Sequence, residues 1–234
     1  MSYIIKTIMI LSLFAATIAA HGQDENTEEK LKIDVGADLI SSYVWRGWYL
    51  AGPSIQPELS ISAYGFTLGT WGSKDFSTFE KEIDFYFSFE FKGFSVRVSD
   101  YWMMYEDAPY FKNKGNHLIE AGLGYTFPEK FPLSLEVNTL ILGNEDVCEE
   151  DGRQYYSTYI SLSFPFSIKD IKIETGIGIS PFKGMYSSKL DVVTATVKAT
   201  KELQLSTNYA LPVYTELIVS PTQNNIFLVF GINF

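Results

Sequence analysis

Carboxylates recur at alternate positions in one segment of the chain. Glu82, Asp84 and Glu90 share one face of this segment. The apolar residues of the other face are Ile83, Phe85, Phe87, Phe89 and Phe91. Because successive side chains of a strand point to opposite sides, the segment is predicted to form a strand with an apolar and an acidic face. Carboxylates that line a water-filled path favour cations, so the pattern indicates ion selection rather than catalysis.

Six charged residues are the candidates for such a path, and they are Asp38, Arg46, Asp84, Glu90, Arg97 and Glu120. Two interpretations stay open for them. They line a narrow, acidic, water-filled lumen, or they form ion pairs that satisfy one another and plug it. Arg46 is expected to set a constriction with Asp38 or Asp84, to brace a loop, or to bind lipopolysaccharide phosphate.

Acid–base catalysis has weak support in this sequence. The chain has two histidines, and His21 lies near an expected processing site, which leaves His117 without a nucleophile motif beside it. A hydrolase that uses His117 is therefore the weaker alternative, and no cofactor is predicted. The acidic segment 144–152 lacks the ligand spacing of a calcium loop, so no metal site is predicted, and Cys148 within it is expected to be a free thiol.

The elements that position these residues follow from a period-2 pattern that returns along the chain. The expected strands cover 33–44, 54–63, 66–72, 83–91, 94–104, 118–127, 133–142, 155–166, 171–180, 190–199, 203–209 and 226–234. The connections alternate between short turns and longer polar loops. This organisation predicts an all-β fold, an up-and-down antiparallel transmembrane β-barrel of about 12 strands. A β-sandwich is the alternative, and the regular alternation of loop length disfavours it.

The last strand alternates strictly and carries an apolar face that includes Phe230, Ile232 and Phe234. An apolar strand edge invites aggregation in water, whereas a barrel turns such a face to lipid and pairs the strand with the first one. The aromatic ending also resembles the signal that the barrel-assembly machinery binds. These three residues are therefore the predicted assembly signal.

The other end of the chain is predicted to be processed. Residues 1–22 combine a positive start with a short apolar run and small residues, which indicates a cleaved signal peptide. Residues 23–30 are expected to form a short acidic periplasmic segment, and residues 31–234 the barrel. The predicted location is the bacterial outer membrane of a Gram-negative cell, with both termini in the periplasm.

Four tryptophans lie close to the expected long loops, namely Trp45, Trp48, Trp71 and Trp102. Amphipathic aromatic rings favour membrane interfaces, so they are predicted to form a girdle at the outer interface. Asp100 fits the pattern poorly, because it continues the apolar series that begins at Phe94. A bulge near Ser99 would turn it away from lipid.

Composition limits the partners. Hydrophobic residues make up 46% of the chain and aromatic residues 16%, which suits a barrel with apolar residues at alternate positions. The net charge of −10 argues against nucleic acid as a partner. The expected partners are outer-membrane lipid and lipopolysaccharide, the barrel-assembly machinery, and small solutes or ions.

Three short motifs in the region 35–75 resemble the amino-terminal signature of the TorF family of porins. They are Ser42-Tyr43-Val44-Trp45-Arg46-Gly47, then Pro53-Ser54-Ile55-Gln56-Pro57, then Gly69-Thr70-Trp71-Gly72-Ser73. Ser41-Ser42 departs from the Ser-Asp that often precedes the tyrosine in that family. The resemblance implies an outer-membrane barrel with a channel role and carries no substrate.

The expected function is therefore that of a porin, which lets small solutes or ions diffuse passively through a narrow acidic lumen. Two alternatives remain beside it: a non-conducting structural or adhesive barrel, and an outer-membrane hydrolase that uses His117.

Overall fold

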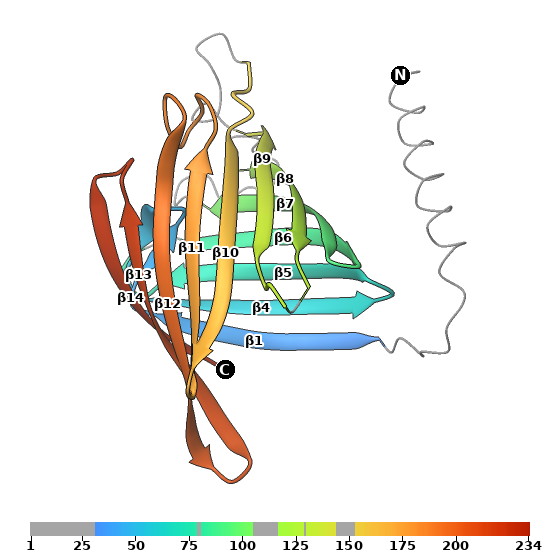
Figure 1. Cartoon of the computed structure of the whole chain (residues 1–234), viewed down its shortest axis with the longest axis vertical. Helices are drawn as coiled ribbons and strands as arrows, with labels where there is room; N and C mark the ends of the chain where they lie inside the picture. Colours follow the sequence, from blue (N-terminus) through green and yellow to red (C-terminus); the bar gives the residue numbers. More distant parts are fainter. Residues whose placement is uncertain (1–30, 79–80, 105–116, 129, 144–152) are drawn as a thin grey trace. The chain divides into compact units, whose positions relative to one another are not determined.

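The structure is a computed structural model, and it describes residues 31–78, 81–104, 117–128, 130–143 and 153–234 (Figure 1). The predicted signal peptide and acidic segment (1–30) and the acidic loop 144–152 lie outside the described residues. In the part of the chain that is described, no helix has the length and apolar character needed to cross a membrane.

Twelve antiparallel strands close into a barrel in the order β1-β14-β13-β12-β11-β10-β9-β8-β7-β6-β5-β4. Their bounds are β1 (Lys32–Ile40), β4 (Ser54–Ala63), β5 (Phe66–Asp75), β6 (Lys81–Phe91), β7 (Phe94–Met104), β8 (His117–Thr126), β9 (Ser134–Leu142), β10 (Thr158–Ile168), β11 (Ile171–Ser180), β12 (Asp191–Ser206), β13 (Tyr209–Ser220) and β14 (Asn225–Asn233). Two short strands, β2 (Tyr43–Trp45) and β3 (Trp48–Ala51), form a separate hairpin. The predicted all-β fold, an up-and-down antiparallel barrel, and its strand number are confirmed.

The barrel has two distinct ends. The turn end holds the start of β1, the end of β14 and the short connections, of which Tyr64-Gly65 and Lys92-Gly93 are two-residue turns. Both residues of each turn have positive φ, which is the geometry that matches the twist of a tight hairpin. The loop end holds hairpin β2–β3 and the connections that follow β5, β7, β9, β11 and β13.

Several expected boundaries are wrong. The first expected strand, 33–44, ends at Ile40, because residues 43–45 belong to hairpin β2–β3, and the strand expected over 155–166 covers Thr158–Ile168. Two more errors lie near the end of the chain, and proline explains one of them. A turn was expected at 200–202 and a loop over 211–225, whereas β12 continues to Ser206 and β13 spans Tyr209–Ser220. Pro212 is tolerated in β13 because the pairing of β13 with β14 begins only at Val213, so Pro212 has a strand partner on one side alone.

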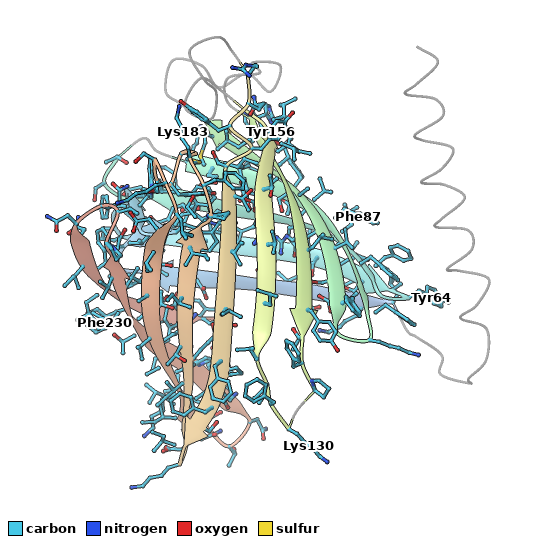
Figure 2. All side chains as sticks on the ribbon, turned by 45° about the horizontal axis from the view of Figure 1, so that its top comes forward. Tyr64, Phe87, Lys130, Tyr156, Lys183 and Phe230 are labelled. Atoms are coloured by element: carbon cyan, nitrogen blue, oxygen red, sulfur yellow. The ribbon has the colours of Figure 1, made fainter. Side chains whose placement is uncertain are left out.

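The barrel wall separates apolar from polar side chains. Along β14, Leu228 and Phe230 are 55% and 56% exposed on the outer face, whereas Val229 between them is 5% exposed inside. Figure 2 shows Phe87 and Phe230 pointing away from the barrel. The outer face is therefore apolar, and the interior receives the alternate residues.

The closure between the first and last strands is short. Asp38, Leu39 and Ile40 pair with β14, and Ala37 exchanges backbone hydrogen bonds with Phe234, whereas the residues of β1 before Ala37 pair with β4. Figure 1 shows that the turn of the β12–β13 hairpin extends beyond the neighbouring turns at this end of the barrel. A polar cavity of about 270 Å³ lies here, lined by residues that include Asp34, Asp38, Gln56, Glu58 and Trp71.

Candidate functional site: the hairpin in the loop-end mouth

Hairpin β2–β3 turns at Arg46-Gly47, where φ is 49° and 80°. A Cβ atom on Gly47 would clash with Ser220 Oγ on β13 and would lie 3.1 Å from Thr194 Cγ2 on β12. Both of those neighbours belong to the inner face of the wall and are buried. The hairpin tip therefore packs against the barrel interior, and glycine is required there for both its conformation and its size.

Arg46 reaches a carboxylate on a distant strand. Its Nη1 donates to Glu120 Oε2 at 2.5 Å and its Nη2 to Glu120 Oε1 at 2.8 Å, which is a bidentate ion pair. The two side chains are 10% and 4% exposed. Glu120 lies on β8, so this pair ties the hairpin to the wall of the barrel.

Aromatic rings surround the guanidinium. Its Cζ lies 4.7 Å from the ring centroids of Trp45 and Tyr159 and 5.6 Å from that of Tyr186. Arg46 Nη1 also donates to Tyr186 Oη, and Tyr101 Oη donates to Glu120 Oε1 at 2.9 Å. The cation is therefore held by hydrogen bonds in its plane and by ring faces around it.

Burial and charge set the ionisation of this group. Burial acts to lower the pKa of Arg46, but the facing Tyr186 and Glu120 outweigh it and hold that pKa above its ordinary value. Burial raises the pKa of Tyr186 to about 12, although the Arg46 charge opposes the rise. Arg46 is thus a permanent cation and Tyr186 a neutral phenol at neutral pH.

The interior of the loop end is packed. Leu118, Leu140, Tyr186 and Val193 form one buried cluster, against which Trp45 of the hairpin packs. Ile40, Ile218 and Val229 form another, and Tyr43 and Val44 of the hairpin pack against that one. Apolar burial from both sides therefore holds the hairpin in place.

The structure distributes the six predicted lumen residues over separate places. Arg46 pairs with Glu120 rather than with Asp38 or Asp84, which were its expected partners. Asp38 accepts hydrogen bonds from Asn233 Nδ2 at 2.6 Å and Tyr214 Oη at 3.4 Å at the β1–β14 closure. The prediction that Arg46 pairs with Asp38 or Asp84 is thus wrong, because its partner is Glu120.

The other three candidates line the inner face of β6 and β7. Asp84 is buried towards the loop end, whereas Glu90 is exposed near the turn end. Arg97 lies with its Cζ 3.9 Å from the ring centroid of Tyr86, and its Nε donates to Ser99 Oγ at 3.1 Å. These residues therefore belong to different levels of the interior rather than to one ring.

Sequence reasoning missed the tyrosines of the site. A usable signal was present, because Tyr159 lies over Gly178 of the neighbouring strand, where a Cβ would clash with the tyrosine Oη. Tyr86 lies over Gly69 and Tyr214 over Gly231 in the same way. An inward tyrosine opposite a cross-strand glycine is thus a repeated feature of this interior.

The expected tryptophan girdle is wrong for two of its four members. Trp71 faces inward, with its ring centroid 5.4 Å from that of Tyr43, and Trp45 packs inside the mouth, 5.6 Å from Tyr101. The hairpin folds back into the barrel, which carries Trp45 with it, and strand alternation puts Trp71 on the face of Glu58. Trp48 follows the hairpin turn with its Nε1 buried, and Trp102 faces outward.

Aromatic rings do gather on the outer face, but at the turn end. Phe94 lies 4.5 Å from Tyr125, which lies 4.8 Å from Phe127, and Phe131 continues the series to Phe164 of β10. Phenylalanine and tyrosine form this outer-face cluster, which the tryptophan positions did not predict.

Asp100 stays on the outer face. Its pairing with β6 and β8 shows no register shift near Ser99, so the expected bulge is absent there. Asp100 Oδ1 lies 2.9 Å from His117 Nδ1, and the His117 ring stacks on Trp102 at 5.8 Å. The carboxylate is therefore partnered by an imidazole beside an indole ring.

Among the described residues, no group of three or more His, Cys, Asp or Glu side chains could hold a metal ion.

No family model matches the chain, so the resemblance to the TorF family stays a prediction. A search of curated proteins found no match. A solved structure of a mutant of Rh. blastica porin is similar with a TM-score of 0.41 and 12% identity. That match covers 77% of this chain and 55% of the porin chain, so the chain spans about half of the porin's length.

Proposed function

We propose that this protein is an outer-membrane porin that lets small solutes or ions diffuse through an acidic interior, with hairpin β2–β3 as its constriction. The observation that carries the proposal is the division of the wall into an apolar outer face and a charged inner face in a closed barrel. Closure leaves no unpaired sheet edge along most of the wall, which is what a bilayer demands of strands.

The turn end is assigned to the periplasm and the loop end to the exterior. Short turns on the periplasmic side are the rule for such barrels, and both termini then lie in the periplasm. The outer-face aromatic cluster around Tyr125 and Phe127 is placed at the inner interface of the membrane, where amphipathic rings are favoured. Phe230, Ile232 and Phe234 on the outer face remain the proposed assembly signal.

The interior carries an acidic excess. Asp38, Glu58 and Asp84 belong to its inner face, and Arg97 is a cation on the same face, nearer the turn end than Asp84. An excess of carboxylates along a water-filled path favours cations, so weak cation preference is expected. Arg46 is committed to Glu120, and its effect is to hold the constriction in place.

Planar-bilayer recording of the refolded protein in a salt gradient tests the proposal. Steady current steps with a reversal potential on the cation side support it. Complete silence, at every voltage and pH and in hairpin variants as well, would favour a structural barrel without a path.

A second candidate function has one specific observation behind it. The hydrogen bond between His117 Nδ1 and Asp100 Oδ1 would orient an imidazole on the outer face of the barrel. Release of fatty acid from phospholipid vesicles that disappears in His117→Ala and persists in Asp34→Asn would support a hydrolase. Equal release by wild type, His117→Ala and empty vesicles would remove it.

A further inference from the structure

The first part of β1 has a partner strand on one side only. Lys32–Gly36 pair with β4, whereas contact with β14 begins at Ala37, whose backbone exchanges hydrogen bonds with Phe234. Figure 1 shows β1 continuing past the C-terminal end of β14. Among the residues that the structure describes, no strand therefore covers the β1 edge formed by Lys32–Gly36.

Backbone donors and acceptors of the β1 edge point away from β4. In an antiparallel pair, every second residue directs its N–H and C=O to the same neighbouring strand. Since both groups of Ala37 are directed to Phe234, those of Val35 and Ile33 are directed to the same side, where no strand is described. Val35 and Ile33 are 78% and 59% exposed. Such a row of unpaired groups is a template for one further strand.

A polar cavity of about 270 Å³ borders the same edge. Its lining runs along β1 from Asp34 to Asp38 and reaches Asn233 and Phe234 at the end of β14. Gly36 lies on the inner face between Asp34 and Asp38, and its missing side chain leaves room there. A strand added to the β1 edge would therefore direct its inward side chains towards this cavity.

The lining of the cavity is acidic. Its carboxylates belong to Asp34, Asp38 and Glu58, and no described residue of the lining is Lys, Arg or His. Lys32 Nζ reaches Asp34 Oδ2 at 2.9 Å, but these two side chains are 71% and 49% exposed. Gln56 also lines the cavity and is 8% exposed, and its Nε2 donates to Ser73 Oγ, so its Oε1 remains as an acceptor. Ligand side chains with positive charge and N–H groups fit this lining.

The two sides of the edge specify a partner with an alternating sequence. Residues of an added strand that lie beside Ile33 and Val35 would face outward with them, and the residues between would face the carboxylates. We propose that the β1 edge is a docking site for an extended segment of another protein, in which apolar residues alternate with lysine or arginine. In the proposed orientation the turn end opens to the periplasm, so the partner is a periplasmic protein. The docking site does not depend on whether the barrel conducts.

Other occupants of the edge match the cavity less well. Residues 23–30 of this chain carry four carboxylates and one lysine, so they would bring like charges to Asp34 and Glu58. A second copy that paired through its own β1 edge would bring a second Asp34 to the same place. Charge complementarity therefore favours a basic segment from a different protein.

Peptide binding to the whole refolded chain in nanodiscs, where both ends of the barrel meet water, tests the proposal. A fluorescent peptide of alternating valine and lysine should bind and raise its anisotropy. A peptide of alternating valine and glutamate, and the valine–lysine peptide with its backbone N-methylated, should each bind at least tenfold more weakly. Equal binding of the three peptides, or no binding of the valine–lysine peptide beyond that to empty nanodiscs, overturns the proposal.

Substitutions on the two sides of the edge separate backbone pairing from charge. Val35→Pro removes an N–H that points away from β4 and should weaken binding about tenfold, whereas Val35→Thr keeps it and should bind like wild type. Asp34→Asn with Glu58→Gln should bind the two unmethylated peptides alike, and Glu90→Gln, outside the cavity, should keep the preference for lysine. Wild-type affinity in Val35→Pro, or an unchanged preference in the double variant, overturns the proposal.

Infrared spectroscopy gives a test that needs no variant. A valine–lysine peptide labelled with ¹³C at its backbone carbonyls should show the shifted amide I band of a β-strand when it is bound to folded wild type. A bound peptide without that band overturns strand pairing. A dimer of the wild-type chain that forms without peptide and is lost in Val35→Pro would overturn the choice of partner.

Discussion

Arg46 and Glu120 are 74 residues apart in the chain, and their side chains meet inside the barrel as a buried bidentate ion pair. The pair is shielded by ring faces of Trp45, Tyr159 and Tyr186. It joins a short hairpin, whose strands pair only with each other, to the wall of the barrel. The consequences of this architecture can be measured.

Removing Arg46 should destabilise the packing of hairpin β2–β3 inside the mouth of the barrel. Arg46→Ala leaves Glu120 buried without a counter-charge, which costs about 3–5 kcal/mol in comparable buried pairs. The double variant Arg46→Met, Glu120→Leu should recover most of that loss. Urea unfolding in detergent measures the free energies, and an Arg46→Ala chain as stable as wild type would contradict a seated hairpin.

Single-channel conductance is a second measurement of the effect of Arg46→Ala. Arg46→Ala should enlarge the open-state current and change its ion selectivity, whereas Arg97→Ala, at another level of the interior, should leave the hairpin in place. Unchanged conductance and selectivity in Arg46→Ala would exclude the constriction role.

Gly47→Ala should unseat the hairpin tip. The new methyl group meets Ser220 Oγ, and the positive φ of 80° disfavours alanine, so a loss of about 1–3 kcal/mol is expected. Ser220→Gly removes the obstructing side chain, and the double variant should regain the steric part but not the conformational part. Iodide quenching of Trp45 measures the exposure of the hairpin, and thermal unfolding measures the loss of stability. A Gly47→Ala chain with the quenching and stability of wild type would show that the tip is not in contact with β13.

Tyr186 should make stability pH-dependent at high pH. Because burial raises its pKa from 10.0 to about 12 in the folded chain, its contribution is fully present below pH 10 and is lost as the pH rises to about 12. Unfolding free energies between these values should fall less steeply in Tyr186→Phe than in wild type. Tyr209→Phe, on the exposed start of β13, should follow wild type, and equal slopes in all three chains would contradict the burial of Tyr186.

The outer face should reject charge if it meets lipid. Leu228→Lys places an ammonium group on that face and should cost about 2–4 kcal/mol if the residue lies near the bilayer midplane. Glu90→Lys, on the inner face at the turn end, should cost much less. Folding yields in phospholipid vesicles compare the two, and similar yields would argue against a lipid-facing β14.

Local pattern was sufficient for the wall of the barrel. Alternation along β6 and β14 gave both the strands and their faces, because side-chain direction in a strand depends only on the residue's parity. The same rule placed Glu90 and Arg97 on the inner face. It failed at β13, where Pro212 suggested a loop, because the missing strand partner that tolerates proline is not visible in the local sequence.

The site itself needed the tertiary structure. The sequence predicted that Arg46 follows the end of the first strand and opens a long loop, and that Glu120 points inward. Only the closed barrel decided that the turn folds back into the mouth, that its cation meets Glu120 rather than Asp38 or Asp84, and that Tyr186 caps it. The physical reason is that strand parity is set by neighbours in the chain, whereas a contact across the barrel depends on strand order, stagger and closure together.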